Sequence, residues 1–150
     1  MIKRLSELVP TERRWLAKAV VAIILADGIV EDQQIKFMKR LFRQLLGEEP
    51  QDTITEIKNL LRKKEIPELE KLQVGNLDRL IFILDVLTAS VFANGKKLKS
   101  EVDKYFEVGR KLGLEVGTLS YRLSLEAERE RVKRKLTEMK GEIGEFLRIA

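Results

Sequence analysis

The residues of this chain best suited to chemistry are the oxygen-bearing side chains around two glycine-containing turns. They are Asp27, Glu31 and Asp32 at the first turn and Asn94, Glu101 and Asp103 at the second. The 150 residues include no Cys and no His. This excludes disulfides, thiolate chemistry, His-dependent catalysis and ordinary zinc sites, and leaves Ca²⁺, Mg²⁺ and Mn²⁺ as the metals to consider. No pair of carboxylates has a spacing that defines an acid–base catalyst, so the sequence predicts that the protein is not an enzyme.

The two turns belong to an internal repeat with an offset of 67 residues. The segment 15–28 reappears as the segment 82–95, and the match continues without a gap to Leu45 and Leu112. Each copy contains an apolar helical pattern, an acid or amide followed by glycine, and a second amphipathic pattern. The register of the repeat predicts two pseudo-symmetric helix pairs. At both turns we expect the glycine to have a positive φ.

The spacing of the apolar residues predicts an all-α fold, because no segment alternates with the period of two that a strand requires. We expect caps at Thr53, Asn76 and Ser100. A last long helix should start near Thr118 or Ser120. The sequence therefore predicts one domain, 1–150, a helical bundle of two helix-pair repeats over about 11–66 and 76–150 that ends in a long helix.

The apolar stripes of these helices also predict the core. Its expected members are Leu16, Val20, Ile24, Ile35, Leu41, Leu45, Ile83, Leu87, Val91, Val102 and Leu112.

The doubled turn resembles that of the TerB-like family, a helical family named for tellurite-resistance proteins. The resemblance is carried by the turns that begin Ala26-Asp27-Gly28 in the first copy and Ala93-Asn94-Gly95 in the second, and it extends from Trp15 to the start of the last helix. It implies a TerB-like fold of two helix pairs. It also implies an acidic pair, an Asp followed seven residues later by a Glu, that binds a metal or a partner.

Each copy retains only one of the two acids that the resemblance implies. Asp27 matches the Asp, but Gln34 stands at the Glu position; Glu101 matches the Glu, but Asn94 stands at the Asp position. The resemblance therefore implies weak binding of Ca²⁺, Mg²⁺ or Mn²⁺ by Asp27 and Glu101, unless the fold brings the two together. Further oxygen donors would be Glu31, Asp32 and Asp103. The alternative is that these residues serve only as turn and cap residues, with no cofactor bound.

Charge gives little further information about partners. The net charge is +5, from 29 Lys and Arg against 24 Asp and Glu, and the basic clusters interleave with acids. This balance permits nucleic-acid binding without indicating it. We expect a non-enzymatic TerB-like module that docks an unidentified protein, in the stress-response setting that the resemblance implies. Weak divalent metal binding is the alternative, and nucleic-acid binding is a third hypothesis.

The last helix leaves two alternatives open. From Val132 its apolar residues follow steps of four and three, which is the heptad spacing of a coiled coil. This stripe either packs against its own domain or pairs with a second chain to form a homodimer. The longest apolar run, 19–26, is too short to span a membrane, and the start of the sequence lacks the pattern of a signal peptide, so we expect a cytoplasmic protein.

Overall fold

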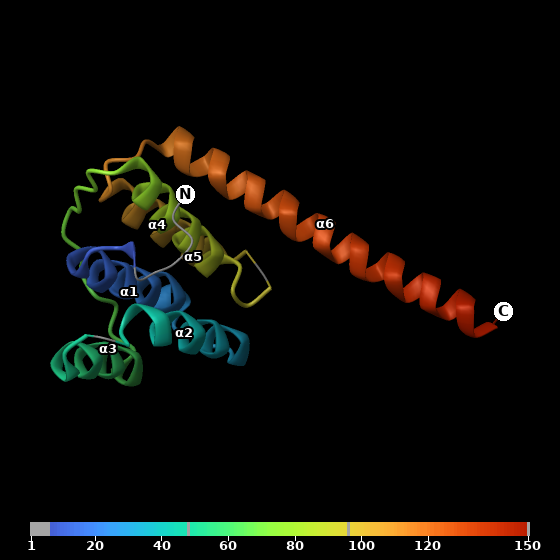
Figure 1. The fold of residues 1–150 in the computed structure, drawn as a ribbon, viewed down its shortest axis with the longest axis horizontal. Helices are drawn as coiled ribbons and strands as arrows, with labels where there is room; N and C mark the ends of the chain where they lie inside the picture. The colour runs from blue at the N-terminus through green and yellow to red at the C-terminus, as the bar shows by residue number, and fades with distance from the viewer. Residues whose placement is uncertain (1–6, 48, 96, 150) are drawn as a thin grey trace. The chain divides into compact units, whose positions relative to one another are not determined.

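The computed structural model describes residues 7–47, 49–95 and 97–149, which form helices and connecting segments without a strand (Figure 1). This confirms the all-α prediction. The elements are α1 (Pro10–Ile24), the 3₁₀ helix η2 (Leu25–Asp27), α2 (Asp32–Leu45), α3 (Gln51–Lys63), α4 (Leu77–Val91), α5 (Lys99–Arg110) and α6 (Val116–Ile149). The chain divides into two compact units, 1–116 and 117–150, which are described separately. The predicted repeat boundaries stay a prediction.

Helix α1 is the centre of the first unit. It packs against α2, α3, α4 and α5, and every residue from Ala19 to Leu25 is buried. A helix that is apolar on all sides must be covered on all sides, because each exposed face would leave apolar surface in water. The four other helices of the unit supply that cover.

The turns after α1 and α4 have the predicted geometry. Gly28 and Gly95 both have φ of 77°, which confirms the expected left-handed conformation. The amide of Gly28 donates to the carbonyl of Leu25 and that of Gly95 to the carbonyl of Phe92, each at 2.9 Å. The glycines thereby end one helix and redirect the chain toward the next.

One predicted helix cap is confirmed and two are wrong. Asn76 caps α4, and its side chain accepts a hydrogen bond from the amide of Arg79 at 3.0 Å. Thr53 does not cap α3, because that helix already begins after Pro50, whose fixed φ suits a helix start. Ser100 does not cap α5, because the extended residue Leu98 precedes the first helical residue.

Residues 65–76 form an extended connection between α3 and α4. Hydrogen bonds from its middle attach it to other parts of the chain: the indole Nε1 of Trp15 donates to the carbonyl of Glu70 at 2.8 Å, and the amide of Leu72 donates to the carbonyl of Lys111 at 2.9 Å. The connection is therefore held against α1 and the end of α5.

Most of the predicted core is buried, with three corrections. Ile35 is 37 % exposed, while Leu41 and Val102 are only half-buried. Helical spacing identifies the side of a helix that is apolar, but the extent of burial depends on whether a neighbouring element covers that side. The remaining predicted residues are buried: Leu16, Val20, Ile24, Leu45, Ile83, Leu87, Val91 and Leu112.

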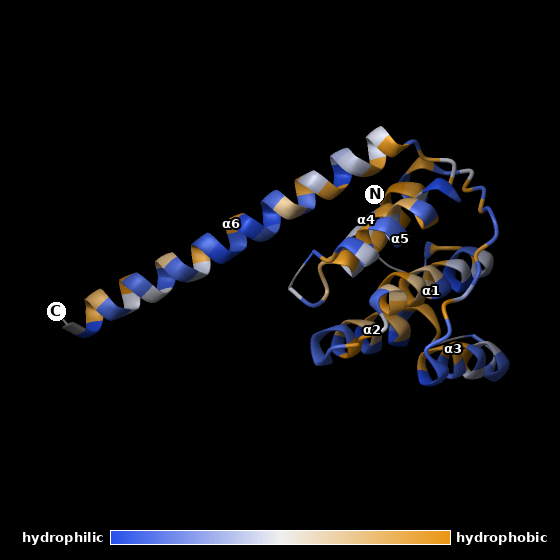
Figure 2. Ribbon diagram, turned by 180° about the vertical axis from the view of Figure 1, so that it is seen from behind, coloured by the Kyte–Doolittle hydropathy of each residue, from blue (hydrophilic) through white to orange (hydrophobic). Residues whose placement is uncertain are grey.

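The second unit consists of α6. Figure 2 shows that this helix is mostly hydrophilic, with hydrophobic residues recurring along it. Ion pairs one turn apart, such as Arg122–Glu126 and Arg148–Glu145, support it along its length. Pairing of its apolar stripe with a second chain stays a prediction. Within the part of the chain that the structure describes, no helix combines the length and the apolar character needed to cross a bilayer.

The left-handed turn at Gly28 predicts the effect of a substitution. A Cβ added there would meet no atom within 4 Å, so only backbone strain opposes a side chain. Gly28→Val should lower the free energy of unfolding by about 1–3 kcal/mol, because a β-branched residue is strained at this φ. Gly28→Asn should cost less, because Asn tolerates left-handed geometry. Chemical denaturation of both variants measures this, and equal stability of wild type and Gly28→Val would contradict it.

Candidate functional site

The candidate site lies where the turn after α1 meets the first turns of α2 and α5. The 3₁₀ helix η2 packs against α5, which brings the acidic end of the first turn close to the start of α5. The side chain of Asp27 accepts a hydrogen bond from the amide of Ile29 at 3.1 Å. This is the turn role expected for an Asp before Gly. Asn94, at the corresponding place in the second turn, is buried.

Gln34 joins the two helix starts. Its Oε1 accepts a hydrogen bond from the amide of Glu31, the residue before α2, at 2.9 Å. Its Nε2 donates to Oε2 of Glu101 in α5, also at 2.9 Å. Both side chains are fully buried. Gln34 thus caps its own helix and supplies a hydrogen bond to Oε2 of Glu101, which would otherwise be buried without a partner.

Glu101 is the most perturbed acid of this site. Burial is the largest cause, and the nearby negative charges of Asp27 and Glu31 act in the same direction, while the hydrogen bond from Gln34 opposes them. Together these effects raise the pKa of Glu101 to about 8. Its second oxygen, Oε1, has no hydrogen-bond partner among the described residues. The carboxyl therefore carries a proton at neutral pH, and a bound cation would have to displace that proton.

The predicted metal ligands are only partly brought together. Asp27 and Glu101 are near enough for their charges to interact, and Glu31 also acts on Glu101. Asp32, in the first turn of α2, and Asp103, further along α5, are both exposed. Among residues 7–47, 49–95 and 97–149, no three acidic side chains form a group that could hold a metal ion. Metal binding stays a prediction.

Two polar contacts were not expected from the sequence. The first is the hydrogen bond between Gln34 and Glu101. The second joins the buried carboxylate of Glu12 to Nε of Arg79, at 3.0 Å to one oxygen and 3.2 Å to the other. Each pair is separated by 67 residues, the offset of the repeat. The repeat offset could have predicted both contacts, because equivalent positions are expected to touch where two equivalent units pack together.

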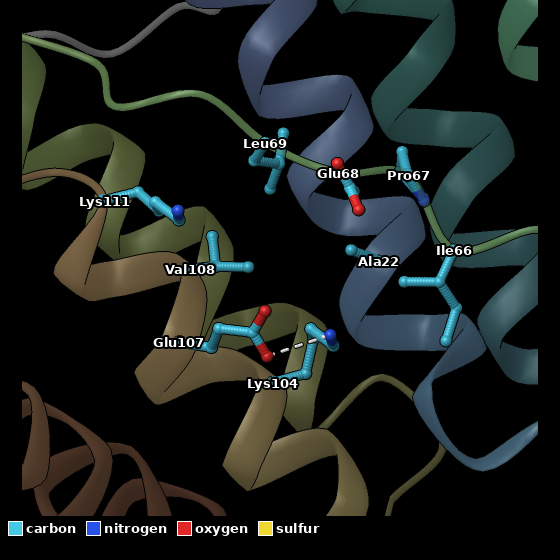
Figure 3. Close-up of a pocket in the computed structure, with 9 residues that line it drawn as sticks. All are labelled: Ala22, Ile66, Pro67, Glu68, Leu69, Lys104, Glu107, Val108 and Lys111. Carbon is cyan, nitrogen blue, oxygen red and sulfur yellow. Dashed lines mark hydrogen bonds and ion pairs between the residues drawn. The ribbon is translucent and has the colours of Figure 1, made fainter.

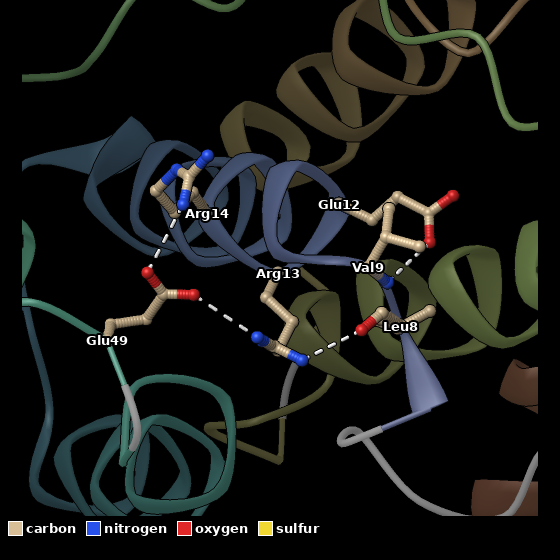
Figure 4. A network of polar contacts seen from close by, with 6 residues as sticks. All are labelled: Leu8, Val9, Glu12, Arg13, Arg14 and Glu49. Atoms are coloured by element: carbon tan, nitrogen blue, oxygen red, sulfur yellow. Dashed lines mark hydrogen bonds and ion pairs between the residues drawn. The ribbon is translucent and has the colours of Figure 1, made fainter.

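A further network holds the start of α1 (Figure 4). Oε1 of Glu12 accepts the amide hydrogen of Val9 at 3.0 Å. The buried Glu49 lies between Arg13 and Arg14, with N–O distances of 3.5 and 3.3 Å, and Arg13 also donates to the carbonyl of Leu8 at 2.8 Å. These contacts satisfy buried charges, which indicates a structural role.

One cavity of about 510 Å³ lies between α1, α5 and the extended connection (Figure 3). Its charged residues are Glu68, Lys104, Glu107 and Lys111. Lys104 and Glu107 form an ion pair at 2.9 Å, and the other two side chains carry opposite charges. The cavity therefore has no net charge with which to select a ligand.

A second hollow, which we call the α2–α3 groove, has a different character. It consists of two adjoining hollows of about 480 and 320 Å³ that share Lys39, Phe42, Lys58 and Leu61. Its floor is formed by apolar side chains of the two helices: Ile35, Met38, Phe42, Leu46, Ile54, Ile57 and Leu61. Its rim is basic: Lys39, Arg43, Lys58, Arg62 and Lys64. None of the described residues that line it is acidic.

Comparison with protein-family models, curated proteins and solved structures finds no match for this chain.

The raised pKa of Glu101 predicts how stability changes with pH. The folded state holds this proton more tightly than the unfolded state, whose pKa is near 4.5. The contribution of Glu101 to stability is therefore fully present below that value and is lost as the pH rises through about 8. Glu101→Gln should reduce the fall in Tm between about pH 5 and pH 8.

Asp103→Asn, an exposed acid on the same helix, is the matched control and should keep the fall seen in the wild type. Thermal unfolding followed by circular dichroism across this range measures both variants. An undiminished fall in Glu101→Gln would contradict the assignment.

Proposed function

We propose that the chain is a non-enzymatic, TerB-like helical module that docks another protein through the α2–α3 groove. The observation that carries this proposal is an apolar floor left open between two helices. Both α2 and α3 pack on α1, but their apolar sides also line the groove, where Ile35 is 37 % exposed and Phe42 and Leu61 are half-buried. Apolar surface that is left open in this way is typical of an interaction site.

Several observations support the two-repeat arrangement within this proposal. Helices α1 and α4 each have 15 residues, and both of their bounds differ by the repeat offset. The starts of α2 and α5 differ by the same number. Equivalent positions contact one another in the pairs Gln34–Glu101 and Glu12–Arg79. Contacts of this kind lie on the axis of a two-fold arrangement, so they favour two pseudo-symmetric halves.

The contacts of the predicted site are a further reason to favour docking. Asp27 accepts a hydrogen bond within the turn, Gln34 caps α2, and Glu101 accepts the hydrogen bond that joins α5 to α2. Each of these is a structural role. The stress-response setting rests on the family resemblance alone and is part of the proposal.

Site-specific photo-crosslinking tests the docking function. A photoreactive benzoylphenylalanine replaces Lys58 on the rim of the groove or Lys63 on the same helix away from it. In cells that express the protein, the Lys58 position should give a discrete crosslinked species, identified by mass spectrometry, that the Lys63 position does not give. Equal crosslinking at the two positions, or none at either, would argue against docking through this groove.

A second candidate function is weak divalent metal binding at Asp27 and Glu101. The observation that favours it is the unpartnered Oε1 of Glu101, which is buried close to two further negative charges. A cation that displaced the proton of Glu101 would offset the repulsion between its carboxylate and the charges of Asp27 and Glu31. Hard cations are bound by several oxygen ligands, however, and here Gln34 takes the place of an acid next to Glu101.

Calorimetric titration with Mn²⁺ and Ca²⁺ tests this candidate. The wild type should bind more weakly than about 0.1 mM, because each half-site has one motif carboxylate. Gln34→Glu with Asn94→Asp should bind more tightly and should gain thermal stability when metal is added. Adding Glu101→Gln to that variant should abolish both effects. If the restored variant does not bind metal, metal binding is rejected as a function of this site. Tight binding by the wild type would instead show that Asp27 and Glu101 already form a working metal site.

A further inference from the structure

The rim of the α2–α3 groove holds cations that are not engaged elsewhere. Lys39 and Arg43 lie one turn apart on α2, while Lys58 and Arg62 lie one turn apart on α3. Within the described residues, none of these four side chains forms an ion pair; Arg62 donates only to the amide oxygen of Asn59, at 2.9 Å. Two rows of positive charge therefore flank the apolar floor and are available to an acidic partner.

The depth of the floor determines how far the side chains of a bound partner must project into the groove. Met38 is 4 % exposed and Ile57 is 2 % exposed, so they lie below the surface, whereas Phe42 and Leu61 are only half-buried. A flat bilayer surface cannot reach a recessed floor of this kind. A helix can, because side chains spaced three and four residues apart project as a ridge into the groove between two helices.

Charge and shape together identify the occupant. Resting on the proposed docking function, we infer that the α2–α3 groove binds an amphipathic helix of a partner protein whose apolar stripe is flanked on both sides by Asp or Glu. The apolar side chains of this helix would fill the two hollows of the floor. Its acids would pair with the lysines and arginines of the rim, whose long aliphatic stems extend over the edge of the floor.

Fluorescence anisotropy with synthetic peptides tests this partner chemistry on the full chain. The probe is a labelled peptide of about 18 residues, with Leu at alternating steps of three and four and Glu on both flanks. The comparison peptide has Lys in place of every Glu. We expect saturable binding of the Glu peptide, at least about tenfold weaker binding of the Lys peptide, and weakening of the Glu peptide by added salt.

Charge reversal on the protein gives the second arm. Lys39→Glu with Arg62→Glu should weaken binding of the Glu peptide by about tenfold or more, since it reverses one charge in each of the two rows. Lys36→Glu with Lys63→Glu is the matched control. It makes the same change on the same two helices at exposed positions that do not line the groove, and should change affinity by less than about twofold.

The outcomes separate this inference from the proposed function. Equal binding of the two peptides, or no binding of either, overturns the acidic-helix partner, whereas the crosslinks from Lys58 decide docking itself. Vesicles of phosphatidylcholine, with and without phosphatidylglycerol, form the last arm. Binding to the anionic vesicles that is lost in Lys39→Glu with Arg62→Glu, without binding of the Glu peptide, would overturn the inference in favour of a membrane surface.

Discussion

The burial of α1 is the constraint on which the rest of the first unit depends. Its sequence from Ala19 to Leu25 contains no polar side chain, and all of these residues are buried. Such a helix is stable in water only inside a shell of other helices, which here comprises α2, α3, α4 and α5. Each surrounding helix turns one apolar side toward α1. How far each helix is covered on its other sides then determines which surfaces remain open.

The site at the start of α2 and α5 follows from that packing. Because η2 continues α1 and packs on α5, the acid of the first turn lies near a carboxyl that the helices have removed from water. Gln34 stabilises the buried carboxyl, since its amide donates a hydrogen bond to Glu101, whereas a carboxylate at position 34 would repel it. The same packing separates α2 from α3 on their outer sides and leaves the groove. The two features have a common origin but different chemistry, one acidic and buried, the other apolar with a basic rim.

The sequence predicts the features that depend on local chemistry. Gly28 and Gly95 are recognisable as left-handed turn residues, and Asn76 as a cap, because each acts on neighbouring backbone. The sequence is a poorer guide to features that depend on how the helices pack against one another. Ile35 has helical spacing like that of the buried residues, yet no element covers it fully. The role of Gln34 cannot be predicted from its own copy, because its partner Glu101 belongs to the other copy and the contact depends on how the helices pack. The groove could not be predicted from the sequence, because it depends on where α3 packs. The repeat gives no information on the position of α3.

The central position of α1 also has a consequence for synthesis on the ribosome. Its covering helices α4 and α5 are encoded far downstream, and α5 ends at Arg110, whereas α1 ends at Ile24. At about 5–20 residues per second, the intervening chain takes about 4–17 s to emerge. Until α4 and α5 have emerged, α1, whose residues from Ala19 are buried in the folded chain, has only α2 and α3 to cover it. The nascent chain is therefore a natural client for chaperones that bind exposed apolar segments, and its first half cannot complete its core before the second half arrives.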